Sequence, residues 1–187
     1  AYVTYAASFD QFFQSINSGI GLMVQADDAG QGVYKTNSVQ AMYSYRLQVN
    51  REFFIKFGME GGFTQATVDW DRLVFLDQID PINGPTNPTE EIRPDNLSNT
   101  YLDIGAGLLA YNRYFYGGFS VKHLNTPDES FLDGDENLKE GLPLRLTVHG
   151  GTEIRLREGN NQQGPAFISP NIMLIKQGDF GQINAGA

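Results

Sequence analysis

The sequence of 187 residues contains no cysteine. A disulfide framework and a metal site built on thiolates are therefore excluded. No apolar stretch approaches 18 residues, which excludes a transmembrane helix but is compatible with a transmembrane β-barrel, whose strands are short and individually weak in hydropathy. Ala1 begins directly in a strand-like run, so we expect any export signal to lie outside this chain.

Positive charge is scarce, because 13 basic residues face 22 acidic ones and the net charge is −9. Residues 69–100 hold seven acids and two arginines, and residues 125–141 hold six acids and one lysine. Each of these segments carries a charge of −5, so the rest of the chain is about neutral. Nucleic-acid binding needs a basic footprint, and this distribution argues against it.

Glycine and aromatic residues are plentiful, with 21 Gly, 13 Phe and 9 Tyr. From Phe53 to Phe63 every second residue is apolar, whereas the positions between include Lys56 and Glu60. Such alternation is typical of a β-strand with one apolar and one polar face. Together with frequent turn residues, it predicts an all-β protein.

We expect a single domain over residues 1–187, an antiparallel up-and-down transmembrane β-barrel of which this chain is an incomplete segment. The alternation predicts nine strands, at residues 1–10, 19–26, 34–49, 52–68, 101–111, 113–124, 142–157, 166–177 and 180–187. Bacterial single-chain barrels have even strand numbers, and open sheet edges are not viable in lipid. Because nine is odd and both ends stop in mid-pattern, we expect the middle of a longer chain.

The predicted links between strands follow a pattern along the chain. Successive links of a meander fall at alternate ends of the sheet, and the second, fourth and sixth links are predicted to be long. They are 27–33, 69–100 and 125–141, and they would share one end. This is the arrangement of outer-membrane barrels, in which 69–100 and 125–141 would be long extracellular loops.

The two faces of the predicted strands differ in charge. The apolar face, which includes Val39, Tyr43, Phe57, Leu108 and Val148, has no charged residue in the five clearest strands. Contact with lipid would exclude charged residues from this face, because a charge at mid-bilayer costs about 2–4 kcal/mol. Burial in the core of a soluble protein would exclude them too. The opposite face interleaves glycines with a predicted lumenal network of Arg46, Lys56, Glu60, Asp103, Lys122, Arg145, His149, Glu153 and Arg155.

Glycines in mid-strand weaken a water-facing sheet, whereas in a confined lumen they let charged side chains of both signs meet. The strands are also long for a soluble sandwich. These features favour the membrane barrel over a soluble lipid-binding β-barrel or sandwich, which would bury Phe53, Phe57 and Phe63.

No catalytic residue, cofactor site or metal site is predicted. His149 shares the polar face with Arg145 and Glu153, but no nucleophile motif accompanies it, so a salt-bridge and hydrogen-bond network is the better interpretation. His123 falls on the apolar parity near a strand end, where an interfacial or loop-capping role is expected. DGDEN at 133–137 has the start of a calcium loop but lacks the glycine at its sixth position, so a solvated acidic loop is expected.

Segments along nearly the whole chain, in order, also match a known family in their residues. They are SFDQFF, SGIGLMVQADDAGQG, SVQAMYSYRLQVNREFFIKFGMEGGF, DQIDP with NPTEE, YLDIGAGLLAYNRYFYGGFSVKHLNTPDESF, LPLRLTVHGG and ISPNIMLIKQGDFGQINAGA. They resemble the PorP/SprF family of the type IX secretion and gliding-motility apparatus of Bacteroidota.

The resemblance implies an outer-membrane barrel without enzymatic activity that assists secretion or surface anchoring of adhesins by engaging the C-terminal sorting domain of the cargo. It also implies contacts with outer-membrane lipid and with type IX translocon or periplasmic peptidoglycan-linked components. A passive porin or transport channel shares every fold-level feature and is the alternative.

The acidic loops are the predicted place of cargo contact. A loop as long as 69–100 is usually functional or disordered. Its apolar residues indicate a folded extracellular loop that packs over the barrel mouth, with plugging of the lumen as the alternative role. The predicted contact residues are Leu73, Phe75, Asp77, Asp80, Glu90, Glu91, Asp128, Glu129 and Phe131.

Overall fold

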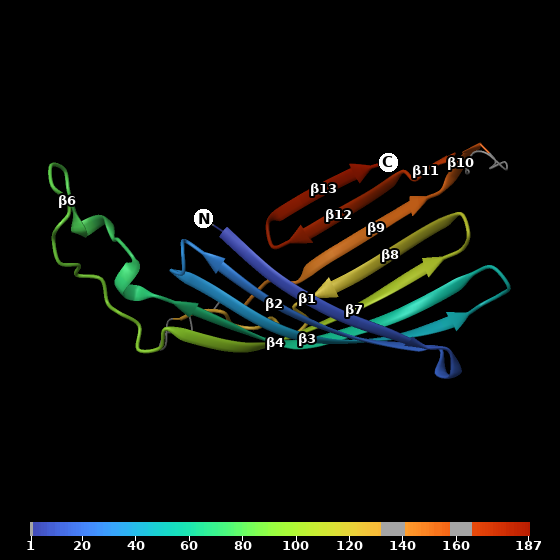
Figure 1. Ribbon diagram of the computed structural model, residues 1–187, viewed down its shortest axis with the longest axis horizontal. Helices are drawn as coiled ribbons and strands as arrows, with labels where there is room; N and C mark the ends of the chain where they lie inside the picture. The colour runs from blue at the N-terminus through green and yellow to red at the C-terminus, as the bar shows by residue number, and fades with distance from the viewer. Residues whose placement is uncertain (1, 132–140, 158–165) are drawn as a thin grey trace.

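The computed structural model describes residues 2–131, 141–157 and 166–187, and within them nine strands form one antiparallel sheet. Each strand pairs with its neighbours in sequence order, which confirms the predicted nine-stranded meander (Figure 1). The strands are β1 (Tyr2–Phe13), β2 (Ser18–Ala29), β3 (Tyr34–Gln48), β4 (Phe54–Val68), β7 (Ser98–Tyr111), β8 (Phe115–Lys122), β9 (Arg145–Thr152), β12 (Asn171–Gln177) and β13 (Phe180–Gly186).

Short elements lie in the links between these strands. Two small hairpins pair β5 (Ile79–Asp80) with β6 (Gly84–Pro85) and β10 (Ile154–Arg157) with β11 (Ala166–Ile168). Three single 3₁₀ turns are η1 (Gln14–Ile16), η2 (Trp70–Arg72) and η3 (Leu76–Gln78). In the described part of the chain, no helix has the length and apolar character needed to span a membrane.

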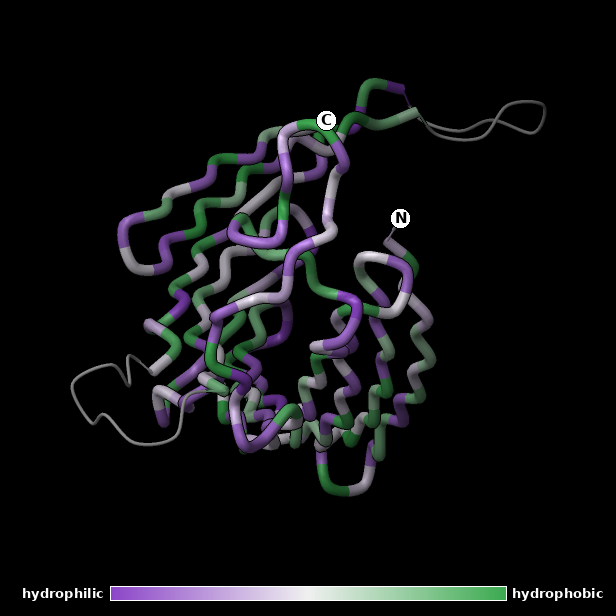
Figure 2. Tube along the Cα trace, turned by 90° about the vertical axis from the view of Figure 1, so that its left-hand side faces the viewer, coloured by the Kyte–Doolittle hydropathy of each residue, from purple (hydrophilic) through white to green (hydrophobic). Residues whose placement is uncertain are grey.

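The sheet curls into an open arc, which Figure 2 shows from the end where the long loop lies. β1 and β13 are its two edges, and within the described residues they do not pair with each other. A sheet that tilts and curls in this way closes into a barrel only when its edge strands meet. The arrangement is therefore that of an open β-barrel segment.

The apolar side chains of the strands point outward instead of into a core. Across the described residues, Ala66 and Pro127 are the only buried residues with apolar side chains. Phe63 and Met59 on β4 are 63% and 66% exposed, and Phe57 is 46% exposed. The soluble alternative, in which these phenylalanines are buried, is therefore wrong. Hydrophilic and hydrophobic residues alternate along the strands in Figure 2, and since successive side chains point to opposite faces, the polar residues occupy the concave face.

Asparagine side chains form two of the tight turns at one end of the sheet. The Asn50 side-chain oxygen accepts hydrogen bonds from the backbone N–H groups of Glu52 and Phe53, both at 2.9 Å. The Asn112 side-chain oxygen accepts in the same way from the backbone N–H groups of Tyr114 and Phe115, at 2.8 and 2.9 Å. Asparagine favours such turns because its side chain bonds to the backbone two and three residues onward.

Two predicted strands are interrupted in the structure. The strand expected over 142–157 begins only at Arg145 and breaks at Glu153, so its last part becomes the separate strand β10. The strand expected over 166–177 breaks between β11 and β12, where Pro170 has no N–H to give to a ladder. Alternation in sequence does not reveal such breaks, because the side-chain period continues on both sides.

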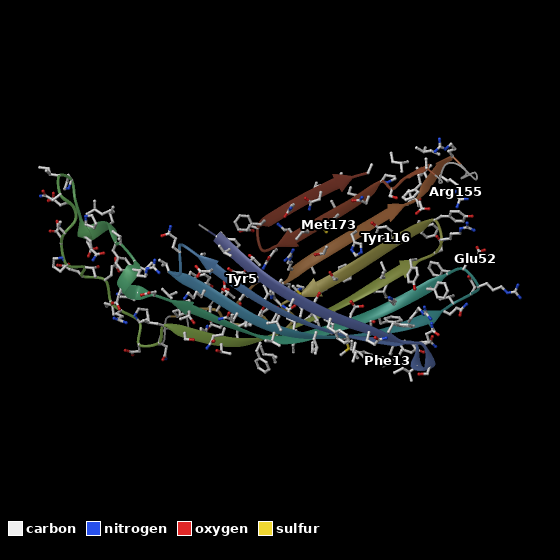
Figure 3. All side chains as sticks on the ribbon, viewed as in Figure 1. Tyr5, Phe13, Glu52, Tyr116, Arg155 and Met173 are labelled. Atoms are coloured by element: carbon white, nitrogen blue, oxygen red, sulfur yellow. The ribbon has the colours of Figure 1, made fainter. Side chains whose placement is uncertain are left out.

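The lengths of the links also differ from expectation. The second link, predicted to be long, is a four-residue turn at 30–33, because β2 continues to Ala29. The link from β9 to β12, predicted to be short or moderate, contains the β10–β11 hairpin. Figure 3 shows Phe13, Glu52 and Arg155 together at this end of the sheet, opposite the end from which loop 69–97 projects.

Replacing one methionine on each of two neighbouring strands by lysine tests which face of the sheet contacts lipid. Met59 points outward and Met42 inward, opposite Glu60 in the register of β3 and β4. In the full-length protein in phospholipid vesicles, Met59→Lys is expected to lower the free energy of unfolding by about 2–4 kcal/mol, because the charge faces lipid. Met42→Lys is expected to cost less than about 1 kcal/mol. Urea titration measures both, and an equal or larger cost at Met42 would contradict the orientation.

Candidate functional site

An ion pair on the concave face joins two strands that are not neighbours. Lys122 Nζ on β8 lies 3.0 Å from Glu60 Oε1 on β4, and β7 runs between them. Glu60 is opposite Gly105 of β7, and a Cβ atom at Gly105 would come within 2.6 Å of Glu60 Oε1. The glycine therefore leaves the space through which the carboxylate reaches its partner, as predicted for charges that meet across glycines.

Arg46 and Lys56 lie directly opposite each other on β3 and β4. The Arg46 guanidinium carbon is 4.5 Å from the centre of the Phe12 ring and 5.6 Å from the centre of the Phe54 ring. It also donates to the Asn17 side-chain oxygen at 3.4 Å. Cation–π contacts thus hold Arg46 against the inner wall near the tight turns.

Asp103 pairs with a histidine and not with a basic residue of the predicted network. Its Oδ1 lies 3.0 Å from His123 Nδ1, and both side chains are largely buried. The apolar placement predicted for His123 is wrong, because β8 ends at Lys122 and the backbone of His123 has a positive φ of 60°. This local reversal turns the ring to the concave side, where it meets Asp103 of β7.

The remaining members of the predicted network divide into two groups. His149 on β9 packs over Gly118 and lies 6.0 Å from the Tyr116 ring between centroids, and Arg145 is opposite Lys122 in the register. Glu153 and Arg155 lie beyond the end of β9, at the break and in β10 (Figure 3). The structure does not bring those two to the ion pair.

Loop 69–97 is held together by two aspartates. Asp77 Oδ2 accepts hydrogen bonds from the Glu90 backbone N–H at 2.7 Å and from the Thr89 hydroxyl at 2.9 Å. Asp80 Oδ1 accepts hydrogen bonds from the backbone N–H groups of Ile82 at 2.9 Å and of Asn83 at 2.8 Å. These donors stabilise the charged form and lower the pKa of both carboxyl groups.

The same loop exposes aliphatic side chains. Leu76, Ile82 and Ile92 are 87%, 91% and 88% exposed, and the loop projects beyond the strand ends (Figure 1). The prediction that its apolar residues pack over the barrel mouth is therefore wrong for Leu76. Half-buried Phe75 does pack, with its ring 4.8 Å from that of Trp70. 

Sequence reasoning did not single out Ile82 and Ile92, because single apolar residues in a polar segment are common at protein surfaces and give no signal of their own. The other predicted contact residues in this loop vary in exposure. Leu73 is half-buried, whereas Glu90 and Glu91 are exposed.

The described part of the second acidic segment lies along the edge of β7. The Asn125 side chain accepts from the Ile104 N–H at 3.1 Å and donates to the Leu102 carbonyl at 2.6 Å, as a paired strand residue would. The Asn99 side chain donates to the carbonyls of Asp128 and Ser130, both at 3.0 Å. The Asn125 amide thus satisfies backbone groups of β7 where the shorter β8 no longer reaches it, and the Asn99 amide holds the segment against β7.

Of the predicted contacts in this segment, Glu129 is exposed and Phe131 is half-buried. The DGDEN segment lies outside the described residues. Elsewhere, in the part of the chain that the structure describes, His, Asp and Glu side chains form no group that could hold a metal ion.

The Glu60–Lys122 pair can be measured by a double-mutant cycle. Glu60→Gln and Lys122→Gln are expected to show a coupling of about 1 kcal/mol in the free energy of unfolding, because side chains 24% and 35% exposed are partly screened by water. In a Gly105→Ala background the coupling should fall close to zero, since the added methyl takes the place of the carboxylate. An unchanged coupling in that background would contradict the geometry.

The pH dependence of loop 69–97 follows from its two aspartates. A lowered folded pKa means that the hydrogen bonds stabilise the loop above the unfolded pKa of about 3.9 and that this stability is lost as the pH falls through the folded value. Amide protection of Ile82, Asn83 and Glu90 is therefore expected to persist near neutral pH and to decrease only below about pH 4. Hydrogen exchange measures it.

Single substitutions serve as controls for that pH dependence. Asp77→Asn is expected to reduce the protection of Glu90 already at neutral pH, and Asp80→Asn to reduce that of Ile82 and Asn83. Protection that survives both substitutions would show that other contacts order the loop.

Comparison with known proteins identifies the family. The family model described as type IX secretion system membrane protein PorP/SprF matches residues 1–187, the whole chain. Searches of curated proteins and of solved structures find no match. The outward apolar face and the polar concave face agree with the membrane character that the family description states. The chain belongs to the PorP/SprF family of type IX secretion system membrane proteins.

Proposed function

We propose that the protein holds large secreted cargo proteins, such as adhesins, at the sheet end from which loop 69–97 projects, and so assists their secretion or surface anchoring. The proposal places the barrel in the outer membrane with this loop outside the cell. It assigns the contact to a C-terminal sorting domain of the cargo. The role is one of binding and requires no catalytic residue.

The observation that carries the proposal is the exposure of Leu76, Ile82 and Ile92, each at 87% or more, on a loop beyond the strands. Aliphatic side chains on the outward face of the strands are explained by lipid, but these three lie on the projecting loop. A group of exposed apolar side chains rimmed by polar residues is typical of a protein interaction site, whereas a single one is not, so the proposal requires that the three act together. The hydrogen bonds of Asp77 and Asp80 order the loop before a partner arrives, which reduces the entropy cost of binding.

Charge supports the same interpretation. Residues 69–100 carry a charge of −5, and Glu90 and Glu91 are exposed beside Ile92. An acidic rim around aliphatic side chains favours a partner surface that is apolar at its centre and basic at its margin. Exposed Glu129 extends the acidic surface from the neighbouring segment.

The opposite end of the sheet is the side on which periplasmic translocon or peptidoglycan-linked components would bind. The β10–β11 hairpin lies there and exposes Ile154, Leu156 and Ile168 at 48%, 67% and 39%. This hairpin provides a matched set of exposed aliphatic residues for a control.

Replacing the three aliphatic residues of the loop tests the proposal. Leu76→Ser, Ile82→Ser and Ile92→Ser combined are expected to reduce the cargo recovered with the tagged full-length protein from native outer membranes by about tenfold or more, equivalent to about 1.4 kcal/mol. Quantitative mass spectrometry measures the recovery. The control combines Ile154→Ser, Leu156→Ser and Ile168→Ser and should leave cargo recovery unchanged. Equal recovery with both triple variants would overturn the assignment to the loop.

A passive channel is the second candidate function, since the concave face is polar and carries a cavity of about 420 Å³. Conductance of the purified full-length protein in a planar bilayer separates the two functions. A steady open pore, together with recovery of the barrel without any cargo, would favour the channel.

A further inference from the structure

A cavity of about 420 Å³ opens on the concave face, nearer to the tight turns than to the long loop. Its floor is a row of residues in register across five adjacent strands: Gly19, Ser44, Gly58, Gly107 and Ser120. The volume falls in the range of about 300–1,000 Å³ found for pockets that bind small ligands.

Charged residues line the cavity on both sides of this floor. Lys122 and Glu60 neutralise each other at 3.0 Å. Lys56 also lines the cavity and lies directly opposite Arg46, and like charges in such a pair repel. In the described part of the chain, no carboxylate lies within ion-pair distance of Lys56 or Arg46. Asp10, the other carboxylate of the lining, is on β1, three strands away from Lys56. The wall formed by β3 and β4 therefore has uncompensated positive charge.

The floor suits a polypeptide more than a compact anion. Glycines without side chains let another backbone approach the sheet closely. The hydroxyl groups of Ser44 and Ser120 can donate to or accept from peptide groups. Asp10, at the far side, can accept from backbone N–H groups.

We propose that this cavity binds a short, extended polypeptide segment that carries carboxylate side chains, with a carboxylate of the segment near Lys56. This binding is separate from the cargo contact proposed for loop 69–97. It rests on side chains of the inner wall that loop 69–97 does not touch.

Binding of a defined probe to the detergent-solubilised full-length protein tests the proposal. The probe is fluorescein-labelled Gly-Glu-Gly-Glu-Gly-amide, followed by fluorescence anisotropy, and its Gln counterpart is expected to bind about tenfold more weakly. Lys56→Gln should weaken binding of the acidic probe about fivefold, whereas Arg51→Gln, which removes a charge from an exposed turn at the same end, should not. Equal binding of both probes would overturn the proposal, as would inorganic phosphate that competes as well as the unlabelled peptide, since an anion site alone would then be present.

Two glycine substitutions on β4 provide a steric test with a matched control. A Cβ atom at Gly58, inside the cavity, or at Gly61, on the outward face, would meet its nearest neighbours at 3.9 and 4.0 Å, which is ordinary contact. Gly58→Leu is expected to reduce probe binding more than tenfold by filling the cavity, and Gly61→Leu to leave it unchanged. If Gly58→Leu fails to fold, Lys56→Gln decides, because it relieves repulsion with Arg46 and should fold. Retained binding in a folded Gly58→Leu variant would overturn the site.

The loop variant of Leu76, Ile82 and Ile92 separates this proposal from the one for cargo. That variant should bind the acidic probe with unchanged affinity, because none of its substitutions reaches the cavity. A loss of probe binding in it would place the peptide on the loop and overturn the cavity proposal.

Discussion

Backbone hydrogen bonds between neighbouring strands hold this protein together, since in the described strands only Ala66 is a buried apolar residue. A soluble domain of this size is stabilised mainly by an apolar core. Here the apolar side chains point outward, where lipid replaces that core. Inside a bilayer every backbone N–H and C=O needs a partner, so the ladder of nine strands cannot be interrupted without a substitute. Asn125 is such a substitute, because its side chain bonds to β7 where β8 has ended.

The same constraint decides the character of the concave face. With the apolar residues on the outside, the alternate positions are free to be polar, small or charged. Curling of the sheet brings these positions toward one another, and glycine at Gly105 and Gly118 leaves room for the side chains of Glu60 and His149. The face thus combines a cross-strand ion pair with an open cavity, and neither requires the loops.

The long loop differs from the wall in how it is ordered. Its fold depends on side-chain carboxylates that accept backbone hydrogen bonds, on the Arg93–Asp71 ion pair and on the Trp70–Phe75 ring contact. Such an arrangement leaves aliphatic side chains free on the outside, so the loop can present Ile82 and Ile92 to another protein without losing its own structure. The wall and the separately ordered loop are therefore stabilised independently of each other, as the proposed binding of cargo at the loop requires.

Sequence alone determined the all-β class, the nine-strand order and the two faces. A side-chain period of two assigns every residue of an unbroken strand to one face of the sheet or the other. The sequence also predicted in general terms that glycines on the polar face let charged side chains of both signs meet, without indicating which residues pair. Tertiary structure decided what depends on breaks and partners. The positive φ at His123 turned that ring toward Asp103, and the break at Glu153 separated Arg155 from the network. The tertiary structure also decided the exposure of the loop isoleucines. Burial depends on which distant parts of the chain pack against a residue, and no local sequence pattern encodes those contacts.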